Sequence, residues 1–253
     1  MSRLPASTNA LRLAGITITA RESGLPLIGD LSLIVPPGEI VTVMGPSGSG
    51  KSTLLAYVGG FLDRTAFTAR GEVAIGAEPL TDLPPEARRL GVLFQDAVLF
   101  PHLSVAGNLL FGLPRRRSMT HRQRRAVATE ALASAGLDGF VDRDPATLSG
   151  GQRARVALLR TLLAKPLALL LDEPFGKLDA ALKEEFRQLV FRHARERNLP
   201  TLLVTHDPSD AAAAGGPVID LADHAAGMSR TSYDYAAPRT VGRLWPLLGR
   251  ARN

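Results

Sequence analysis

A nine-residue loop, GPSGSGKST from Gly45 to Thr53, constrains this chain more than any other feature of its sequence. The segment before the loop, Glu39 to Met44, is rich in β-branched residues and predicts a buried strand. The segment after it, Leu54 to Phe61, can begin a helix. Glycine and serine are also common in flexible linkers. Because a strand and a helix flank the loop directly, we predict a fixed turn within an α/β fold.

The spacing of this loop fits the phosphate-binding pattern G-x-x-x-x-G-K-S. Gly48 and Gly50 can adopt backbone angles that side chains forbid, so successive N–H groups turn inward and form a nest for anionic oxygens. The helix that follows adds its unpaired N-terminal donors. Lys51 can reach the outer phosphates, and the Ser52 hydroxyl can complete the shell of a Mg²⁺ ion. The loop therefore predicts a site for nucleotide phosphates.

Three further apolar segments predict strands, and each finishes on a polar side chain. RLGVLFQ ends at Gln95, LALLLDE ends at Asp172 and Glu173, and TLLVTH ends at His206. In an open parallel sheet, ligands bind outside the carboxyl ends of the strands, so we expect these side chains to gather beside the phosphate loop. One such residue alone is usually a satisfied cap or core polar group. Together with the loop, the four residues form a candidate active site.

Phosphoryl transfer depends on positioning and on charge neutralisation, and these side chains suit both. We expect Asp172 to hold Mg²⁺ through water opposite Ser52, and Glu173 to polarise the water that attacks the γ-phosphate. His206 is expected to hydrogen-bond a γ-phosphate oxygen. Gln95 is expected to join the metal shell or the water. These assignments predict nucleotide hydrolysis, with Glu173, His206 and Gln95 as catalytic residues and Ser52, Gln95 and Asp172 as metal ligands.

A second glycine-rich helix start, LSGGQ, spans Leu148 to Gln152. Ser149 can cap the helix while Gly150 and Gly151 expose backbone donors, so the stretch predicts a second anion site. A helix cap without further function is the structural alternative. One bound nucleotide needs only one loop for its phosphates. The second helix start therefore suggests a site that serves another copy of the protein.

Length and composition indicate a globular chain. With 253 residues, it is either one large domain or a core with an inserted subdomain. Its longest strongly apolar window, from Val156 to Leu171, is broken by Arg160, Lys165 and Pro166, so we expect no transmembrane helix. The N-terminal residues lack the apolar core of a secretory signal. The absence of cysteine excludes disulfides and thiolate metal sites.

The net charge of +6 raises nucleic acid as a partner. The densest basic run, Arg115 to Arg125, has no aromatic residue between its arginines, whereas proteins that bind single strands interleave stacking rings. We interpret the run as a solvated face, with contact to anionic lipid or to a membrane partner as the functional alternative. Charge alone does not decide between them.

The motifs, taken in order, resemble the nucleotide-binding subunit of an ABC transporter. The likeness runs from about Leu11 to Asp220, and the segment Phe94 to Leu113 is similar to bacterial importers of spermidine, ferric iron, thiamine or oxyanions. The matching motifs are a Walker A (Gly45 to Thr53), a Q-loop (Gln95), the signature LSGGQ (Leu148 to Gln152), a Walker B with catalytic glutamate (Leu167 to Glu173), a D-loop (Gly176 to Asp179) and a switch histidine (His206).

The resemblance implies an α/β fold of the P-loop NTPase kind, with a mainly parallel sheet, an N-terminal antiparallel β subdomain and an inserted α-helical subdomain. The implied ATPase domain covers residues 1–222, with the helical insertion at about 97–150, and a short tail covers 223–253. Two copies are expected to sandwich ATP between the Walker A of one and the signature of the other. The nucleotide contacts implied are Gly45, Pro46, Ser47, Gly48, Ser49, Gly50, Lys51, Ser52, Thr53, Ser149, Gly151 and Gln152.

By the same resemblance, the expected cofactors are ATP and Mg²⁺. The expected partners are a second copy, integral-membrane permease subunits and, indirectly, a periplasmic binding protein, with no nucleic acid. The expected location is peripheral, on the cytoplasmic face of the inner membrane. The transported solute cannot be inferred, because other polypeptides select it.

Other function classes fit less well. A soluble ATPase of the same superfamily acting on nucleic acid or ribosomes is the main alternative. DNA-repair members insert a long coiled coil, whereas only 52 residues separate Gln95 from Leu148 here. Translation-associated members carry two cassettes in one chain. A small-molecule kinase would use a phosphate loop but would not need LSGGQ.

The chain departs from the family pattern at three places. Many members stack adenine on an aromatic ring before the phosphate loop, yet no Phe, Tyr or Trp occurs before Tyr57, and Arg21 offers the only flat side chain near the aligned position. We therefore predict weak discrimination between ATP and GTP. Gly107 stands where an acidic residue is common, and Gly176-Lys177 replaces the usual small pair before Leu178. These last two changes concern subunit coupling.

Overall fold

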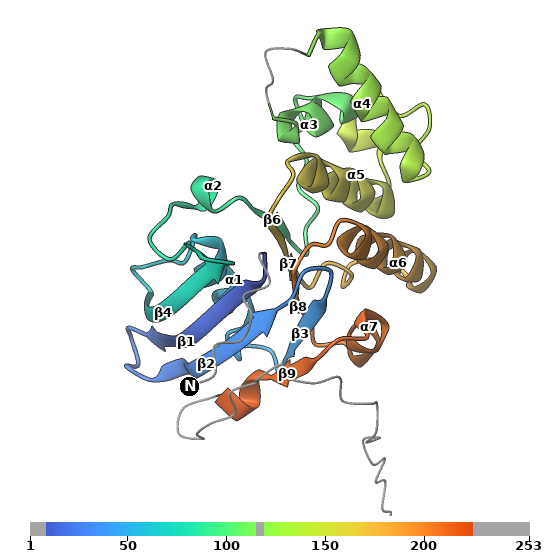
Figure 1. Ribbon diagram of the computed structural model, residues 1–253. Coiled ribbons are helices and arrows are strands. Elements are labelled where there is room, and N and C mark those ends of the chain that lie inside the picture. The colour runs from blue at the N-terminus through green and yellow to red at the C-terminus, as the bar shows by residue number, and fades with distance from the viewer. Residues whose placement is uncertain (1–8, 115–118, 225–253) are drawn as a thin grey trace, which may run out of the picture.

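Two β-sheets, with helices between them and on one side, make up the fold (Figure 1). The computed structural model describes residues 9–114 and 119–224. The antiparallel sheet has the strand order β2-β1-β4-β5, and the parallel sheet has the order β6-β7-β8-β3-β9. The strands are β1 (Leu11–Ala20), β2 (Pro26–Val35), β3 (Ile40–Met44), β4 (Phe67–Ile75), β5 (Glu78–Pro79), β6 (Leu90–Leu93), β7 (Ala168–Asp172), β8 (Thr201–Val204) and β9 (Val218–Asp220).

Seven α-helices and two 3₁₀ turns lie within the described residues. They are α1 (Lys51–Gly59), α2 (Pro85–Arg88), α3 (Val105–Gly112), α4 (His121–Ser134), α5 (Gly150–Leu163), α6 (Ala180–Glu196), α7 (Pro208–Ala214), η1 (Pro145–Thr147) and η2 (Leu221–His224). In that part of the chain, no helix combines the length and the apolar character that a membrane span needs. The predicted fold class, with a parallel core sheet, an antiparallel N-terminal sheet and a helical region, is confirmed.

Alternate residues of the parallel strands face two separate hydrophobic cores, as expected for a sheet covered on both faces. On β7, Leu169 and Leu171 belong to the core beneath α5 and α6, whereas Leu170 belongs to the core around α1. All three side chains are fully buried. The parallel sheet is therefore the rigid centre on which both layers are built.

Helix α1 lies between the two sheets. Its Leu54, Leu55 and Val58 are buried against strands of the antiparallel sheet and against the parallel strands β3, β7 and β8. Burying each such side chain contributes about 1.5–3 kcal/mol. This packing fixes the first turn of α1, and therefore the phosphate loop, against the carboxyl edge of the parallel sheet.

The helical region stands above the sheets in Figure 1 and consists of α3 and α4 together with the first part of α5. Thr120 begins α4 with a capping box in which Gln123 takes part. On the inner face of α4, Ala128 and Leu132 are buried. The predicted boundaries of the helical insertion (about 97–150), the ATPase domain (1–222) and the tail (223–253) stay predictions. Residues 225–253 lie outside the described residues.

Helix α6 begins after Asp179 and ends before Asn198. Asp179 accepts a hydrogen bond from the backbone N–H of Leu182 and caps the helix start. At the other end, Asn198 has a left-handed φ of 51°. Two strands are shorter than predicted. β6 ends at Leu93 and β8 ends at Val204. Gln95 and His206 therefore lie in the loops that follow.

Arginine side chains cap the carboxyl ends of five helices. Because the last carbonyls of a helix have no partner within it and carry partial negative charge, a guanidinium group suits this place. The donors and the acceptor carbonyls are Arg88 to Tyr57 and Val58 in α1, Arg124 to Leu110 and Leu113 at α3, Arg155 to Ala135 at α4, Arg197 to Leu162 in α5, and Arg195 to Ala214 in α7.

The last residue of α3, Gly112, lies directly against α5. A Cβ atom at Gly112 would lie 2.2 Å from the backbone oxygen of Arg160, a distance that requires the two helices to separate. At Gly150, in contrast, an added Cβ would have no neighbour within 4 Å. The two glycines therefore make a matched pair for testing how closely α3 and α5 must pack.

We expect Gly112→Ala to lower the free energy of unfolding by about 1–3 kcal/mol, because it overpacks the helix contact. Gly150→Ala is expected to change that free energy by less than about 0.5 kcal/mol. Urea unfolding followed by circular dichroism measures both. Equal stability of the two variants would contradict the close contact.

Candidate active site

The order of the parallel strands brings the predicted site residues to one edge of the sheet. Strand β7 pairs with β6 on one side and with β8 on the other, and β8 pairs with β3. Because all these pairs are parallel, the phosphate loop after β3 and the polar residues after β6, β7 and β8 follow adjacent carboxyl ends. Their roles as nucleotide or metal ligands stay a prediction.

The phosphate loop requires glycine for two separate reasons. Gly48 and Gly50 have φ values of 82° and 95°, in the left-handed region that side chains disfavour. In addition, a Cβ atom at Gly50 would lie 2.7 Å from Cγ of Leu27. Lys51 is 5% exposed, and its Nζ donates hydrogen bonds to the carbonyl oxygens of Gly45 and Pro46 at 2.8 and 2.9 Å. The ammonium group therefore lies folded back over the loop.

The loop contains one buried polar atom that has no partner in the described part of the chain. The Ser49 hydroxyl oxygen is inaccessible to solvent and forms no hydrogen bond there. Leaving such a group unpaired costs about 1–3 kcal/mol. An anion that lies in the loop could accept a hydrogen bond from this hydroxyl. The unpaired hydroxyl is consistent with a loop that binds an oxygen-rich ligand.

Ser52 and Asp172 meet across the phosphate loop and β7. The Ser52 hydroxyl donates a hydrogen bond of 2.9 Å to Oδ1 of Asp172. Within residues 9–114 and 119–224, no three His, Cys, Asp or Glu side chains group together as a metal site. Mg²⁺ does not need such a group, because it binds one or two protein oxygens and completes its shell with water and substrate phosphates. The Ser52 and Asp172 oxygens therefore fit Mg²⁺.

Burial raises the pKa of Asp172 above its usual value, and the negative charge of Glu173 raises it further. The hydrogen bond from Ser52 and the positive charge of Lys51 act in the opposite direction. A carboxylate in this environment lacks enough positive charge nearby. A cation at the site would supply that charge and favour the ionised form.

Glu173 has a left-handed backbone conformation, with φ of 45°. Non-glycine residues rarely adopt this region, and such strain is often found at functional sites, at a cost on the order of 1–3 kcal/mol. Its backbone N–H donates to the carbonyl of Val204, so the residue remains tied to β8. Its Oε1 lies 3.0 Å from Nδ1 of His206. The Glu173 side chain therefore lies beside His206.

Gln95 lies beside the loop that follows Glu173. A Cβ atom at Gly176 would lie 3.2 Å from Nε2 of Gln95, so the two loops are in close contact. Gln95 also lines a cavity of about 490 Å³ together with Phe94, Val98 and Gly150. Lys177, which replaces a small residue of the family pattern, pairs with Asp96 across this cavity. The Q-loop therefore contacts the D-loop and shares this cavity with the start of α5.

The LSGGQ stretch begins α5 and is exposed at Ser149. The Ser149 hydroxyl accepts a hydrogen bond from the Gln152 backbone N–H, and the Gln152 side chain accepts one from the Ser149 backbone N–H. This capping box confirms the predicted helix start. Among the described residues, no hydrogen bond joins Ser149 to the phosphate loop of its own chain.

A buried polar cluster supports the segment that carries His206, and the sequence did not predict it. Lys183 of α6 pairs with Asp207 and with Asp210, whose Oδ1 lies 3.2 Å from the Lys183 Nζ. Arg187 of α6 also pairs with Asp210 at 3.2 Å, and Thr205 donates to the same carboxylate at 2.8 Å. The i, i+4 spacing of Lys183 and Arg187 can be read from the sequence. Their contact with α7 depends on the tertiary fold.

Arg21, the flat side chain near the aligned adenine position, lies beside the segment that follows α1. Its Nε donates to the carbonyl oxygen of Arg64 at 3.0 Å, and it lines a cavity with Tyr57 at the carboxyl end of α1. The guanidinium plane is therefore held beside Arg64 and away from the first turn of α1.

Comparison with known proteins identifies the family. The family model described as ABC transporter matches residues 28–176, which include the phosphate loop, Gln95, LSGGQ and the β7 carboxylates. The chain belongs to this family. It is an ABC ATPase domain, and its relatives are import ATP-binding subunits and an uncharacterised ATP-binding protein.

Curated relatives differ in how much of their length this ABC ATPase covers. It is 48% identical to the uncharacterised ABC transporter ATP-binding protein YnjD of Escherichia coli, over 78% of this chain and 88% of that protein. It is 40% identical to the spermidine/putrescine import ATP-binding protein PotA of Frankia alni, over 81% of this chain and 43% of PotA. It is 41% identical to the sulfate/thiosulfate import ATP-binding protein CysA of Bacillus cereus, over 72% of this chain and 51% of CysA. The chain thus spans about half the length of these import subunits.

Two solved structures of the bacterial ABC transporter cassette MJ0796 share the fold of this ABC ATPase. The dimeric structure has a TM-score of 0.70 at 34% identity and covers 83% of this chain and 93% of that chain. A second dimeric structure, in a post-hydrolysis state bound to ADP and Pi, has a TM-score of 0.69 at 33% identity over the same shares of the two chains.

The polar cluster behind His206 allows a prediction about the substitution of Lys183. The hydrogen bond that Lys183 donates to Asp207 holds the pKa of Asp207 below the ordinary value of 3.8. A depressed pKa contributes stability that is present above pH 3.8 and is lost as the pH falls through the folded-state pKa. We expect Lys183→Met to cost about 2 kcal/mol of unfolding free energy at pH 7, with a smaller difference below pH 3.8.

Urea unfolding at pH 7 and at pH 3 measures this difference. Lys165→Met, at an exposed lysine after α5, is the matched control and should behave like the parent protein at both pH values. A difference for Lys183→Met that grows in acid would contradict the assigned ion pairs.

Proposed function

We propose that this ABC ATPase hydrolyses ATP to drive solute import through separate membrane-embedded subunits. The observation that carries the proposal is the meeting of the phosphate loop with the Ser52–Asp172 and Glu173–His206 pairs at one sheet edge. Relatives whose names state import functions support the direction of transport. The solute is selected by other polypeptides.

The residues at this edge divide the hydrolysis reaction between them. Lys51 and the N–H groups of the loop and α1 bind the β- and γ-phosphates of ATP. Mg²⁺, when bound, neutralises charge on the phosphate oxygens, and Ser52 and Asp172 would hold it. Glu173 accepts a proton from the attacking water, whose oxygen bonds to the γ-phosphorus as the bond to the β-phosphate oxygen breaks. The products are ADP and inorganic phosphate.

His206 lies where it can serve both Glu173 and the γ-phosphate. Its Nδ1 lies beside Oε1 of Glu173, and when both ring nitrogens carry a proton, the other one can donate a hydrogen bond to a γ-phosphate oxygen. The His206 side chain is 59% exposed and therefore accessible to substrate. The cluster around Asp207 and Asp210 fixes the backbone that carries it.

A second copy of the chain completes the proposed site. Ser149 is exposed and lies at a helix start whose N–H donors suit an anion. The dimeric MJ0796 structures support an arrangement in which two cassettes associate. We infer that Ser149, Gly151 and Gln152 contact ATP held by the phosphate loop of the other copy.

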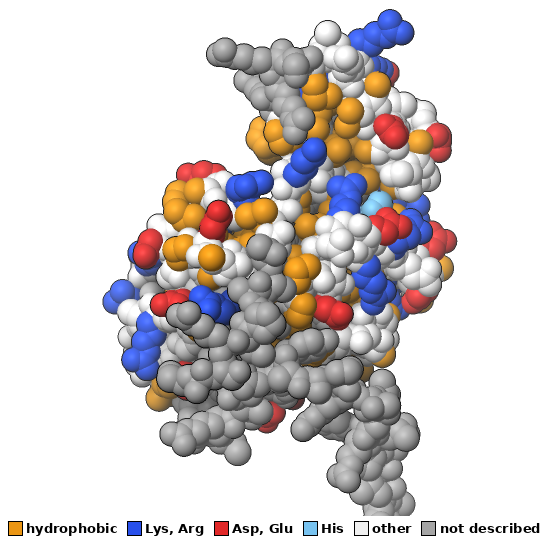
Figure 2. Space-filling model, viewed as in Figure 1, with side chains coloured by type: hydrophobic (Ala, Val, Ile, Leu, Met, Phe, Trp, Pro, Cys, Tyr) orange, Lys and Arg blue, Asp and Glu red, His pale blue; other side chains and the backbone are white. Residues whose placement is uncertain are grey.

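Exposed apolar side chains support a membrane-subunit partner. Phe94, Val98 and Phe111 are 48%, 68% and 67% exposed, and Phe94 and Val98 line the cavity beside Gln95. Figure 2 shows hydrophobic side chains at the surface over α3, in the upper part of the molecule. A helix of a permease subunit that packs here would contact the Q-loop directly. Its movement would thereby be coupled to Gln95 and to the nucleotide.

The distribution of arginines does not favour nucleic acid. On the face shown in Figure 2, basic side chains are dispersed among acidic and apolar ones. Within the basic run, Arg124 caps α3 and Arg125 pairs with Asp142 at 2.6 Å, while residues 115–118 lie outside the described residues. Much of the positive charge therefore serves contacts within the fold.

Glu173→Gln tests the proposed mechanism. Removing the base while keeping the shape should lower kcat by about 10²–10⁴ and leave ATP binding intact. Bound ATP that is not hydrolysed should then hold two copies together, as size-exclusion chromatography with Mg-ATP would detect.

Glu130→Gln, at an exposed glutamate on α4, is the control and should retain full ATPase activity. Undiminished turnover in Glu173→Gln would refute the role given to this carboxylate. A monomer in the presence of ATP would count against the sandwich arrangement.

No Phe, Tyr or Trp precedes Tyr57 in the sequence, and this predicts weak base selectivity. Losing a stack on adenine forfeits about 1–3 kcal/mol of base binding, so kcat/KM for ATP and GTP should differ by less than about tenfold. Steady-state phosphate release with each nucleotide measures the ratio. A strong preference for ATP would show that another group recognises adenine.

A further inference from the structure

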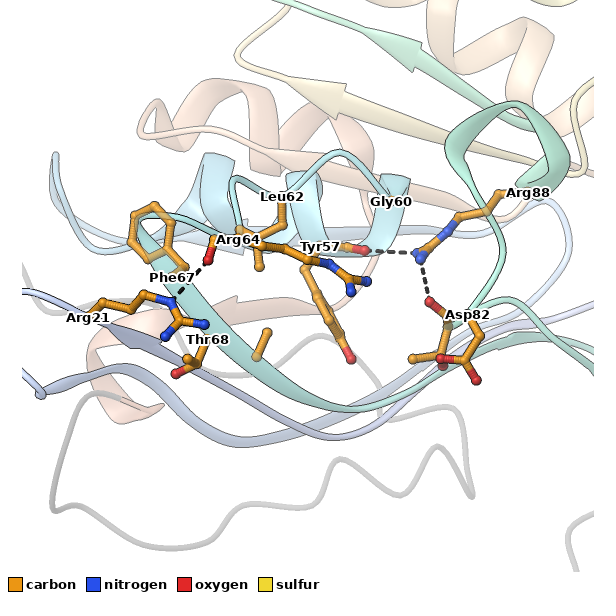
Figure 3. A pocket seen from close by; sticks show the side chains of 11 residues that line it. Arg21, Tyr57, Gly60, Leu62, Arg64, Phe67, Thr68, Asp82 and Arg88 are labelled. Atoms are coloured by element: carbon orange, nitrogen blue, oxygen red, sulfur yellow. Dashed lines mark hydrogen bonds between the residues drawn. The ribbon is translucent and has the colours of Figure 1, made fainter.

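A separate cavity lies at the carboxyl end of α1, at the opposite end of this helix from the phosphate loop (Figure 3). It has a volume of about 320 Å³. None of the residues predicted to contact nucleotide lines it. The lining residues come from the turn after β1, the last turn of α1, the start of β4 and the segment before β6, and the polar ones among them are Arg21, Tyr57, Arg64, Thr68, Thr81, Asp82 and Arg88.

Three guanidinium groups give this cavity its charge. Figure 3 shows Arg21, Arg64 and Arg88 in succession from one end of the cavity to the other. In the described part of the chain, none of the three forms a salt bridge with a carboxylate. Asp82 is the one acidic residue of the lining. The cavity therefore carries about two positive charges without a counter-charge.

Arg88 is a fixed and buried member of this set, with 3% of its surface exposed. Its guanidinium donates four hydrogen bonds of 2.6 to 2.9 Å to the carbonyl oxygens of Leu83, Tyr57, Val58 and Thr81. Arginine has five N–H donors, so one remains for another acceptor. Burial lowers the pKa of Arg88, because the charged group has lost its hydration. A nearby anion would compensate for that loss.

Half-buried apolar groups form the rest of the wall. Tyr57, Leu62, Phe67 and Ala69 line the cavity. The Tyr57 hydroxyl donates to the carbonyl of Gly71 at 2.7 Å, which fixes the ring. The cavity thus combines cationic groups that suit an anionic head with rings that suit a compact apolar body.

We propose that this cavity binds an organic phosphate monoester with a compact apolar body. A phosphate monoester carries close to two negative charges at pH 7, which matches the uncompensated charge of the cavity. Its three oxygens can accept paired hydrogen bonds from guanidinium groups. A ligand here would bridge Arg21, next to the β1–β2 turn, and Arg64, in the segment between α1 and β4.

The test uses 4-fluorophenyl phosphate as the probe and ¹⁹F NMR of the full chain as the measurement. Saturating Mg-ADP is present throughout, so that the phosphate loop is occupied. We expect saturable binding that Arg64→Gln weakens about tenfold, because a charge-assisted hydrogen bond is lost. Arg64 is exposed and holds Arg21 through its backbone carbonyl, so the substitution keeps that contact.

Arg70→Gln is the matched control, because Arg70 is an exposed arginine of β4 that does not line the cavity. It should bind the probe like the parent protein. 4-Fluorobenzoate, with a single charge, should bind more weakly. Equal affinity of the parent and Arg64→Gln, no binding of the probe in saturating Mg-ADP, or tighter binding of the benzoate would each overturn the proposal.

Discussion

Parallel pairing of β6, β7, β8 and β3 is the constraint on which the remaining structure depends. It sets four carboxyl ends side by side, so that residues more than 100 positions apart in sequence, such as Ser52 and Asp172, come within hydrogen-bond distance. The buried aliphatic residues of β7 anchor this sheet in both hydrophobic cores. Helix α1, packed between the two sheets, then points its first turn at the same edge. The chemistry at that edge is a consequence of strand order.

The sequence predicted those parts of the protein that depend on local pattern. Phosphate-loop spacing, the helix cap at Ser149 and the aliphatic run of β7 are all signals within a few residues, and the structure contains the corresponding elements. The ends of β6 and β8 were predicted less well, because apolar residues such as Phe94 continue past the last paired residue. The left-handed backbone of Glu173 has no sequence signal, since it is imposed by the contact with β8.

Charged residues were the hardest part to interpret, because their partners are distant in sequence. The basic composition raised nucleic acid as a partner, yet arginines such as Arg88, Arg195 and Arg197 donate to the last carbonyls of helices to which they do not belong. Amino-acid composition gives the number of charged side chains, but it does not show which group accepts the hydrogen bonds of each arginine. The same reason hid the contact of Lys183 with Asp207. Five of the arginines join helices through hydrogen bonds to backbone carbonyls.

In the dimer proposed above, the capping box of Ser149 lies at the surface where the two copies meet. Because Ser149 and Gln152 already bond to each other in a single chain, the start of α5 is ordered before any partner arrives. Little conformational entropy then remains to be lost at this surface during association. Association of two copies should accordingly not require the signature loop to refold.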